Sequence, residues 1–511
     1  MGGGSSLRRT HMRIAFVYID PSYRVMGPFH VGIASLIAYL KRGGHECQFF
    51  HLMGDVAEEE YIDFLEKNRP DVVAFSVMTN AFPHVAPLAL LTKRHSDALT
   101  ICGGVHATLC PDEVIAVEGI DVVCRGEGEE PLFDLCQGLE EGKDFSNIPN
   151  LWVKRGAGGG ESEKGEEIHK NPLRPLIADL DALPFLDREV FPYKDSFDLQ
   201  FMKRGAFMAS RGCPYNCAYC CNHAIKQLYG GDMYIRFRSV ESIVEEVEMV
   251  VRNFPQVEYN VFHDDLLPMK KEWFADFVTE YRRRIKLPFE MNCHPNLMDR
   301  EIAQMAKSAG CSLMRFGLES GNDHIRRNVL DRHVSTERII NAFACCDEAG
   351  IQTLSYDMIG LPFETRTQIL DTIKLNGRVR PKVMHVSIFY PYPGTKSYEI
   401  CKREGFVTDK HIDTYYEDSV LEQKGVSAEQ VRALRKRFEF LVRLYSRGYK
   451  LPGFLRKMAE EIIDIGILTA TNQYILRAWE KTPQKRSKKA KKDAGPVYIL
   501  EDGEVRVWGV D

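Results

Sequence analysis

The chain lacks the features that mark membrane, secreted and nucleic-acid-binding proteins. Its 511 residues contain no apolar run long enough to span a bilayer and no recognisable signal peptide, so we expect a cytoplasmic protein without a membrane span. The net charge of −5 gives no reason to expect nucleic acid as a partner. The 14 cysteines, without a secretion signal, favour free thiols in a reducing compartment over a disulfide scaffold.

Two cofactor motifs are also missing. No Gly-x-Gly-x-x-Gly follows the first predicted strand, at residues 13–20, and this disfavours a nicotinamide or flavin dinucleotide. No second pair of cysteines or histidines accompanies the cysteines at 213–220, and this disfavours a structural zinc site. A chain of this length is expected to form two or three domains.

What the chain does have is a loop of three closely spaced thiols. Cys213, Cys217 and Cys220 stand in the stretch Cys-Pro-Tyr-Asn-Cys-Ala-Tyr-Cys. Three thiolates can bind three irons of a [4Fe–4S] cluster and leave the fourth iron open to a small molecule. This spacing therefore predicts a catalytic cluster. The alternative is a zinc knot that uses Cys221 or His223 as its fourth ligand.

This loop, with aromatic Tyr219 before its last cysteine, resembles that of the radical S-adenosylmethionine enzymes. The resemblance implies that the open iron chelates S-adenosylmethionine and that one electron cleaves the sulfonium to give a 5′-deoxyadenosyl radical. An external one-electron reductant such as flavodoxin or ferredoxin would supply that electron. Tyr219 would pack on the adenine.

Residues 13–150 alternate short apolar strands with helices. This alternation predicts a doubly wound parallel sheet of Rossmann-like type, which binds ligands at the carboxyl ends of its strands. The expected strands are 13–20, 46–52, 72–78, 99–104 and 121–125, and the later helices 58–68, 83–95, 111–118 and 130–140.

Such a domain ahead of a radical cysteine motif resembles the cobalamin-binding domain of the cobalamin-dependent radical S-adenosylmethionine enzymes. The two adjacent glycines after the fourth strand would let a large ligand approach the backbone closely. We expect the histidine beside them to contact the protein backbone or the tail of the cofactor, and not to be a cobalt ligand. The resemblance implies cobalamin-binding roles for Ser76, Met78, Thr79, Gly103, Gly104, His106 and Glu127.

One departure concerns the cobalt. Many cobalamin proteins carry Asp-x-His-x-x-Gly after the first strand, whereas Asp20 and Gly27 have no histidine between them. We therefore expect the lower face of the corrin to lack a histidine ligand and to be covered by residues of 20–29 or 76–82. The alternative for the whole domain is a ligand-free scaffold that only docks the second domain.

Residues 200–400 repeat the alternation six times. Six units predict an open, partial (β/α)6 barrel of the TIM type, with functional residues at the carboxyl ends of the strands. The expected strands are 207–210, 257–262, 289–293, 312–318, 353–359 and 383–389, and the expected helices 239–254, 272–285, 299–309, 335–349 and 365–377.

Polar residues gather at these strand ends. By the family resemblance, Glu319 in Gly-Leu-Glu-Ser-Gly would hold the methionine or ribose part, and the stretch 358–362 would lie at the adenine. The Gly-Gly-Glu of many relatives is replaced by residues 263–265, so Asp264 and Asp265 could instead cap the next helix. The expected cofactor-binding residues here are Asp264, Asn292, Glu319, Ser320 and Asp357, with Glu364 a further strand-end acid.

The remaining segments are assigned more simply. Residues 1–12 are expected to be an expression leader and 151–199 a linker. Residues 401–511 are expected to be mainly helical, with helices at 426–450 and 454–479 that cap the barrel or wall the substrate pocket, and a hairpin at 497–510. The Lys/Arg-rich run at 481–492 lacks aromatics and is interpreted as a solvated linker.

The resemblance implies methylation of an unactivated carbon, with methylcobalamin as methyl donor and the deoxyadenosyl radical as hydrogen acceptor. A cyclisation, oxidation or rearrangement that uses both cofactors, as in the porphyrin-ring cyclase relatives, is the alternative. A methylthiolating or tRNA-modifying enzyme would carry extra cluster cysteines and a basic module, and neither stands out. The substrate, a small molecule or a peptide, is not specified by the sequence.

Overall fold

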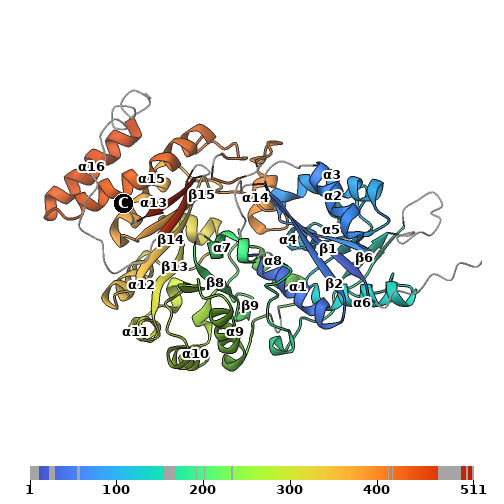
Figure 1. The fold of residues 1–511 in the computed structure, drawn as a ribbon. Coiled ribbons are helices and arrows are strands. Elements are labelled where there is room, and N and C mark those ends of the chain that lie inside the picture. The colour runs from blue at the N-terminus through green and yellow to red at the C-terminus, as the bar shows by residue number, and fades with distance from the viewer. Residues whose placement is uncertain are drawn as a thin grey trace, which may run out of the picture.

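The fold is described from a computed structural model. It describes residues 11–21, 29–53, 58–154, 167–191, 193–200, 202–231, 234–412, 414–416, 418–469, 497–501 and 504–508. The basic run at 481–492 lies outside these ranges, as do most of the expected leader and the end of the helix expected at 454–479. Two α/β units lie side by side along the long axis of the molecule (Figure 1).

The first unit is built on a seven-stranded sheet with the order β2-β1-β3-β4-β5-β6-β7. The first five strands are parallel, which confirms the doubly wound sheet, and the order 2-1-3-4-5 puts the topological switch point between β1 and β3. The strands are β1 Arg13–Asp20, β2 Glu46–Met53, β3 Val72–Ser76, β4 Leu99–Gly103, β5 Val122–Cys124, β6 Leu151–Lys154 and β7 Ile168–Lys170.

The sheet continues beyond the expected boundary at residue 150. β6 and β7 fall in the expected linker, yet β6 pairs antiparallel with β5 and β7 pairs antiparallel with β6. α1 and α6 pack on one face of the sheet, and α2, α3 and α5 on the other. The helices are α1 Val31–Arg42, α2 Glu58–Asn68, α3 Val85–His95, α4 Val105–Leu109, α5 Pro111–Ile115 and α6 Glu129–Glu141, with a 3-10 turn at Thr79–His84.

The second unit is a six-stranded parallel sheet with the order β15-β14-β13-β12-β11-β8, which confirms the open, partial barrel. Each intervening helix packs outside the sheet (Figure 1). The elements are β8 Arg204–Phe207, α9 Val240–Asn253, β11 Tyr259–Phe262, α10 Lys271–Arg284, β12 Phe289–Cys293, α11 Arg300–Ser308, β13 Cys311–Glu319, α12 Thr336–Glu348, β14 Gln352–Ile359, α13 Arg366–Val379 and β15 Val383–Ile388.

The first barrel strand differs from its prediction. It ends at Phe207, and the expected residues 208–210 lead instead to a two-residue strand, β9 Ser210–Arg211, which pairs antiparallel with β10 Arg236–Phe237. This side pairing turns the chain out of the barrel just before the cysteines. The cysteine loop therefore follows the short β9–β10 pair and not the barrel strand itself.

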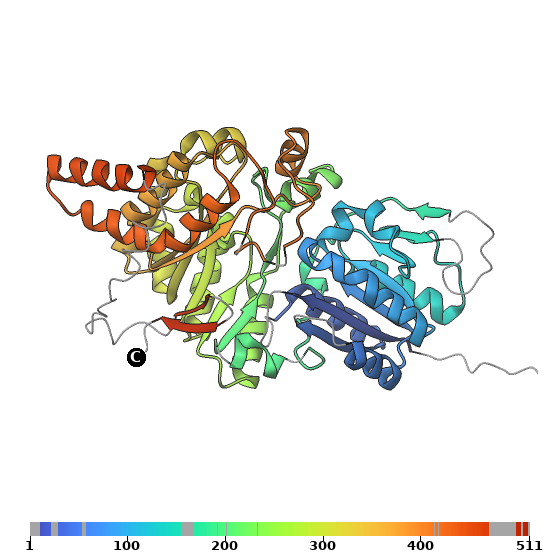
Figure 2. The same cartoon turned by 90° about the horizontal axis from the view of Figure 1, so that it is seen from above.

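The last part of the chain adds a helical layer. α15 packs against α13 and β15, so it continues the outer ring of barrel helices, and α16 packs on α13 and α15. Figure 2 shows α15 and α16 at the end of the molecule away from the first sheet. None of the helices in the described residues combines the length and apolarity that a bilayer crossing needs. The further elements are α7 Phe197–Gln200, α8 Cys221–Leu228, α14 Lys396–Arg403, α15 Ala428–Gly448, α16 Gly453–Thr469, β16 Val497–Glu501 and β17 Glu504–Trp508.

Candidate functional site

The three predicted cluster cysteines lie in the loop between β9 and α8. Gly212 has φ +95°, and a Cβ there would lie 2.3 Å from the carbonyl oxygen of Tyr234, so the turn into the loop requires glycine. Cys217 is buried, Cys213 and Cys220 are half-buried, and all three are free thiols. The loop thus presents three unpaired sulfurs at the barrel's carboxyl end.

The geometry of these thiols does not fit a single zinc ion. Sulfurs on one tetrahedral zinc lie about 3.8 Å apart, because each Zn–S bond is about 2.3 Å. Within the described part of the chain, only a different cluster brings three ligand atoms within 4.8 Å of one another. Both nitrogens of His223 are occupied, by the carbonyl of Cys220 at 2.6 Å and the amide of Lys396 at 3.2 Å. Separated thiols suit separate irons of a cubane.

Arg332 is a buried cation beside this loop, and no sequence pattern pointed to it. Its guanidinium is buried and donates to the sulfur of Cys217 at 3.5 Å and to the carbonyl of Gly317 at 2.5 Å. Burial raises the pKa of the Cys217 thiol, while the charge and hydrogen bond of Arg332 act in the opposite direction. Arg332 therefore stabilises negative charge on the cluster side of the site.

Glu319 sits in a strained position next to Tyr219. Its φ of +67° is unusual for a residue other than glycine, and the register of β13 shifts between Gly317 and Glu319. A Cβ on Gly317 would lie 2.3 Å from Oε1 of Glu319, so glycine makes room for this carboxylate. Burial raises the pKa of Glu319, against the charge of Arg332 and a hydrogen bond with Tyr219. The predicted pair Tyr219 and Glu319 is brought together.

A cavity of about 260 Å³ opens beside Tyr219 and Glu319. Its walls are mostly aromatic and come from the ends of β14 and β15 and from residues 415–416. Burial lowers the pKa of His385 to about 4, so its ring is neutral, and Tyr416 bonds to it at 2.5 Å. Such walls can stack on a planar ring. The lining residues are Tyr219, Glu319, Tyr356, Asp357, Met358, His385, Ser387, Ile388, Phe389, Tyr390, Tyr392, Tyr415 and Tyr416.

Asp264 and Asn292 brace the strand ends. Asp264 is fully buried and accepts hydrogen bonds from the amide of Ala209 at 3.1 Å and the hydroxyl of Ser210 at 2.5 Å. Burial raises its pKa to about 6. Asn292 donates to the carbonyl of Asp264 at 2.7 Å, and its buried Oδ1 has no hydrogen-bond partner. Asp264 thus positions the approach to the cysteine loop, whereas Asn292 keeps an acceptor available.

The side chains of Asp357 and Ser320 bond to neighbouring protein groups, although Asp357 also lines the aromatic cavity. Asp357 accepts hydrogen bonds from Ser355 and from Asn376 of α13, both at 2.8 Å, and burial raises its pKa to about 7. The buried hydroxyl of Ser320 accepts the amide of Asn322 at 3.3 Å. The sequence predicted that both residues stand at strand ends, but it did not predict the face of the sheet on which their side chains lie. We therefore assign them structural contacts.

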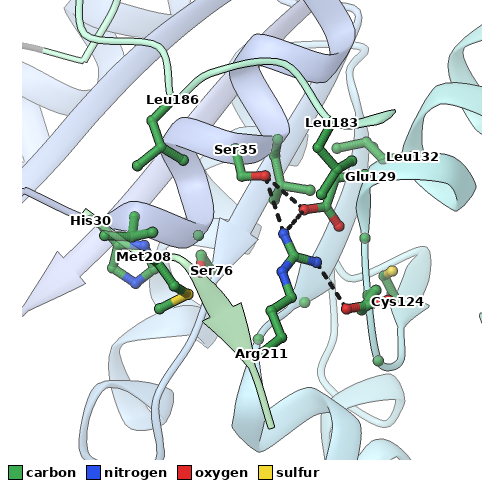
Figure 3. A pocket seen from close by; sticks show the side chains of 18 of the residues that line it. His30, Ser35, Ser76, Cys124, Glu129, Leu132, Leu183, Leu186, Met208 and Arg211 are labelled. Carbon is green, nitrogen blue, oxygen red and sulfur yellow. Dashed lines mark hydrogen bonds and ion pairs between the residues drawn. The ribbon is translucent and has the colours of Figure 1, made fainter. Parts of the chain in front are cut away.

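A second cavity, of about 350 Å³, lies at the carboxyl ends of β3, β4 and β5 and against Phe16 of β1, next to the switch point (Figure 3). Ser76, Gly103, Gly104 and Glu127, for which cofactor-binding roles were predicted, are among the residues that line it. A Cβ on Gly103 would meet nothing closer than 3.7 Å, so a side chain there would occupy cavity space. Gly104, with φ +99°, is needed because a Cβ would lie 2.7 Å from the carbonyl oxygen of Val77.

Three other predicted residues do not line this cavity. Met78 is exposed at the surface, and His106 is buried with its Nδ1 3.3 Å from the hydroxyl of Thr79. The ring of His106 packs on Phe82, with centroids 4.3 Å apart. The histidine beside the glycine pair is therefore turned away from the space in which a ligand would sit.

His30 lines the cavity, and the sequence analysis missed it because it follows Gly27. It is the N-cap of α1, and its Nδ1 accepts the amide of Ile33 at 3.1 Å. Burial lowers its pKa to about 4, so the ring is neutral and its single proton must be on Nε2. The ring's remaining nitrogen is thus a hydrogen-bond donor and not a lone pair for a metal.

Arg211 joins this cavity to the cysteine loop. Its guanidinium donates to Glu129 at 2.6 Å, to Glu127 at 2.9 Å and to Ser35 at 3.3 Å (Figure 3). Burial alone would raise the pKa of Glu129, but the charge and hydrogen bonds of Arg211, with that of Ser35, hold it below its usual range. Arg211 lies two residues before Cys213, so its contacts connect the wall of this cavity to the start of the cysteine loop.

Glu127 has the same joining role. Its second oxygen accepts hydrogen bonds from Arg236 at 2.9 Å and from the amide of Ile177 at 2.8 Å. Both of its oxygens are therefore held by the protein, although it was predicted to bind a cofactor.

Comparison with known families agrees with this division into two sites. Residues 28–135 match the B12 binding domain family, and residues 208–375 match the Radical SAM superfamily. Over 84% of its length the chain is 26% identical to an uncharacterised methyltransferase of Pyrococcus horikoshii, of which 92% is covered. It is also 23% identical to the anaerobic magnesium-protoporphyrin IX monomethyl ester cyclase of Rubrivivax gelatinosus, over 75% of this chain and 68% of that one.

The fold is shared with a solved structure. The radical S-adenosylmethionine methyltransferase TsrM from Kitasatospora setae, with cobalamin and a [4Fe–4S] cluster bound, superposes with a TM-score of 0.64. The match covers 78% of this chain and 79% of that one at 18% identity, which establishes the likeness of fold.

Proposed function

Because the chain belongs to the cobalamin-dependent radical S-adenosylmethionine enzymes, we propose that it is a methyltransferase that acts on an unactivated carbon. The observation that carries the proposal is the pairing of two sites in one chain, with direct contacts between the two units. One site holds three separated thiols beside an aromatic cavity, and the other is a cavity at the switch point of a doubly wound sheet.

The residues of the first site fit a cluster and S-adenosylmethionine. Cys213, Cys217 and Cys220 would hold the cluster, and Arg332 would offset its negative charge. Tyr219 and the other tyrosines offer faces for the adenine, while Glu319 and the unpaired Oδ1 of Asn292 accept hydrogen bonds from ribose or amino groups.

The residues of the second site fit a large planar corrin. Gly103 leaves space at the floor, and Ser76 and the donor Nε2–H of His30 border it. When bound, cobalamin supplies the methyl group, while the cluster and S-adenosylmethionine supply the radical that activates the substrate carbon. The protein's own residues hold the two sites next to each other, through the contacts of Arg211 with Glu127 and Glu129.

The proposal extends to partners. The substrate is a small molecule or a peptide, and a flavodoxin- or ferredoxin-like protein delivers single electrons. The net charge of −5 supports neither an RNA nor a DNA substrate.

A test that needs no known substrate follows the methyl group. Reconstituted protein that holds reduced cobalamin is mixed with methyl-labelled S-adenosylmethionine, and the cobalamin is analysed by mass spectrometry. A methyltransferase labels the cobalamin, and Gly103→Val, which puts a branched side chain into the cavity, should retain neither cobalamin nor label. Unlabelled cobalamin in cobalamin-loaded wild-type protein would favour the cyclase alternative, which the sequence likeness to the Rubrivivax gelatinosus enzyme suggests.

A further inference from the structure

A group of three potential metal ligands lies outside both cofactor sites. His106, Cys110 and Glu113 each offer one ligand atom, and these atoms lie within 4.8 Å of one another. They come from α4, from the residue between α4 and α5, and from α5. α4 ends and α5 begins at Cys110, whose amide bonds to the carbonyl of His106 and whose carbonyl accepts the amide of Val114, and this junction brings the three side chains together.

The histidine of this group is oriented for a metal. His106 is 2% exposed, its Nδ1 is 3.3 Å from the hydroxyl of Thr79, and its Nε2 has no hydrogen-bond partner. When Nδ1–H donates to Thr79, Nε2 carries the lone pair. An outer hydrogen bond of this kind fixes the tautomer of metal-binding histidines. A buried nitrogen without a partner otherwise destabilises the fold.

The distance to Glu113 points the same way. Nε2 of His106 and Oε2 of Glu113 lie 3.7 Å apart, too far for a hydrogen bond. Nitrogen and oxygen ligands on one tetrahedral zinc lie about 3.4 Å apart, given bonds of about 2.1 Å. An inward movement of these side chains would therefore bring the three ligand atoms to coordination distance.

The surroundings favour a cation. The carboxylates of Glu113 and Glu399 act electrostatically on the Cys110 thiol, so this part of the fold is negatively charged. A thiol that coordinates a divalent ion is deprotonated. The ligand set of nitrogen, sulfur and carboxylate oxygen is typical of zinc.

We propose that His106, Cys110 and Glu113 form a zinc site separate from the cysteine loop, with its fourth position taken by water. The site lies two residues from Gly104, so it would fix the segment that follows the floor of the larger cavity. It does not depend on the proposed methyl transfer.

The test uses the full chain with its iron–sulfur cluster. Protein freed of loosely held metal is titrated with Zn²⁺ against a competing chelator, and zinc K-edge absorption, which does not detect iron, reports the ligands. Variants Glu113→Gln and Cys110→Ser are compared with Asp112→Asn. Asp112 is the neighbouring acid on α5 and pairs with Lys170 at 2.5 Å, so it is the matched control.

We expect about one zinc per chain, with one sulfur at about 2.3 Å and nitrogen or oxygen at about 2.0–2.2 Å. Glu113→Gln and Cys110→Ser should each weaken zinc binding at least about tenfold, and Asp112→Asn should not. Glu113 is 56% exposed, so Glu113→Gln keeps the test valid if Cys110→Ser fails to fold. The proposal is overturned by zinc binding that Glu113→Gln leaves unchanged, by a shell composed mainly of sulfur, or by failure to bind zinc.

Discussion

Replacing Arg332 with glutamine should lower the reduction potential of the iron–sulfur cluster. The guanidinium donates to Cys217 at 3.5 Å, and its charge favours the reduced cluster, which carries one more electron. With the electron spread over the cluster, an average separation of about 6 Å and an effective dielectric constant of about 20 give roughly 3 kcal/mol. For a one-electron couple this corresponds to a decrease of about 120 mV.

Glutamine suits this test because it can keep a hydrogen bond to the carbonyl of Gly317, which Arg332 contacts at 2.5 Å. Arg332→Lys retains the charge and should shift the potential by less than about 40 mV, since only the geometry of the contact changes. The potential is measured by redox titration monitored by electron paramagnetic resonance, on anaerobically reconstituted protein. An unchanged or higher potential in Arg332→Gln would refute the placement of the cluster beside Cys217.

Three further predictions follow from other residues. Glu246 is fully buried between Arg188 and Arg238, so Glu246→Gln should cost about 3–5 kcal/mol of unfolding free energy in denaturant titrations; an effect below about 1 kcal/mol would contradict this. The two arginines lower the pKa of Glu246 by more than burial raises it. The contribution of Glu246 to the unfolding free energy is therefore present above a pH of about 4.3 and is lost as the pH falls through its lowered pKa. Glu246→Gln should lack this loss of stability in acid. Nε2 of His30 carries a proton and so cannot bind cobalt. The electron paramagnetic resonance spectrum of the cob(II)alamin form should therefore show no nitrogen hyperfine splitting from an axial histidine, and His30→Ala should leave that spectrum unchanged. A splitting that disappears in His30→Ala would disprove the tautomer.

The sheets and the cluster loop could be predicted from the sequence because their signals are local. Short apolar runs alternating with amphipathic helices indicate parallel sheets, and three cysteines within eight residues need no knowledge of the fold. The expected boundary at residue 150 was less successful, because β6 is specified by pairing with β5 and not by the helix–strand alternation.

The direction of a strand-end side chain could not be predicted. Glu319 and Asp357 are register partners on neighbouring strands, yet the first faces Tyr219 and the second faces α13. The bulge between Gly317 and Glu319 reverses the alternation locally, and the sequence does not reveal it.

Two arginines were missed for a related reason. Arg211 contacts Glu129 of the other unit, 82 positions away, and Arg332 contacts Cys217, 115 positions away, and isolated arginines carry no motif. His30 was overlooked because only the segment before Gly27 was searched for a cobalt ligand. In each case the decisive information is a long-range distance.

The most direct test of the account is the iron and sulfide content of anaerobically prepared protein, measured with the Cys213→Ala, Cys217→Ala and Cys220→Ala variants alongside. The account predicts about four iron and four sulfide per chain in the wild type, a broad visible absorption that the variants lose, and a resonance spectrum that S-adenosylmethionine alters. Negligible iron and sulfide in the wild type, or a cluster that survives all three substitutions, would contradict it.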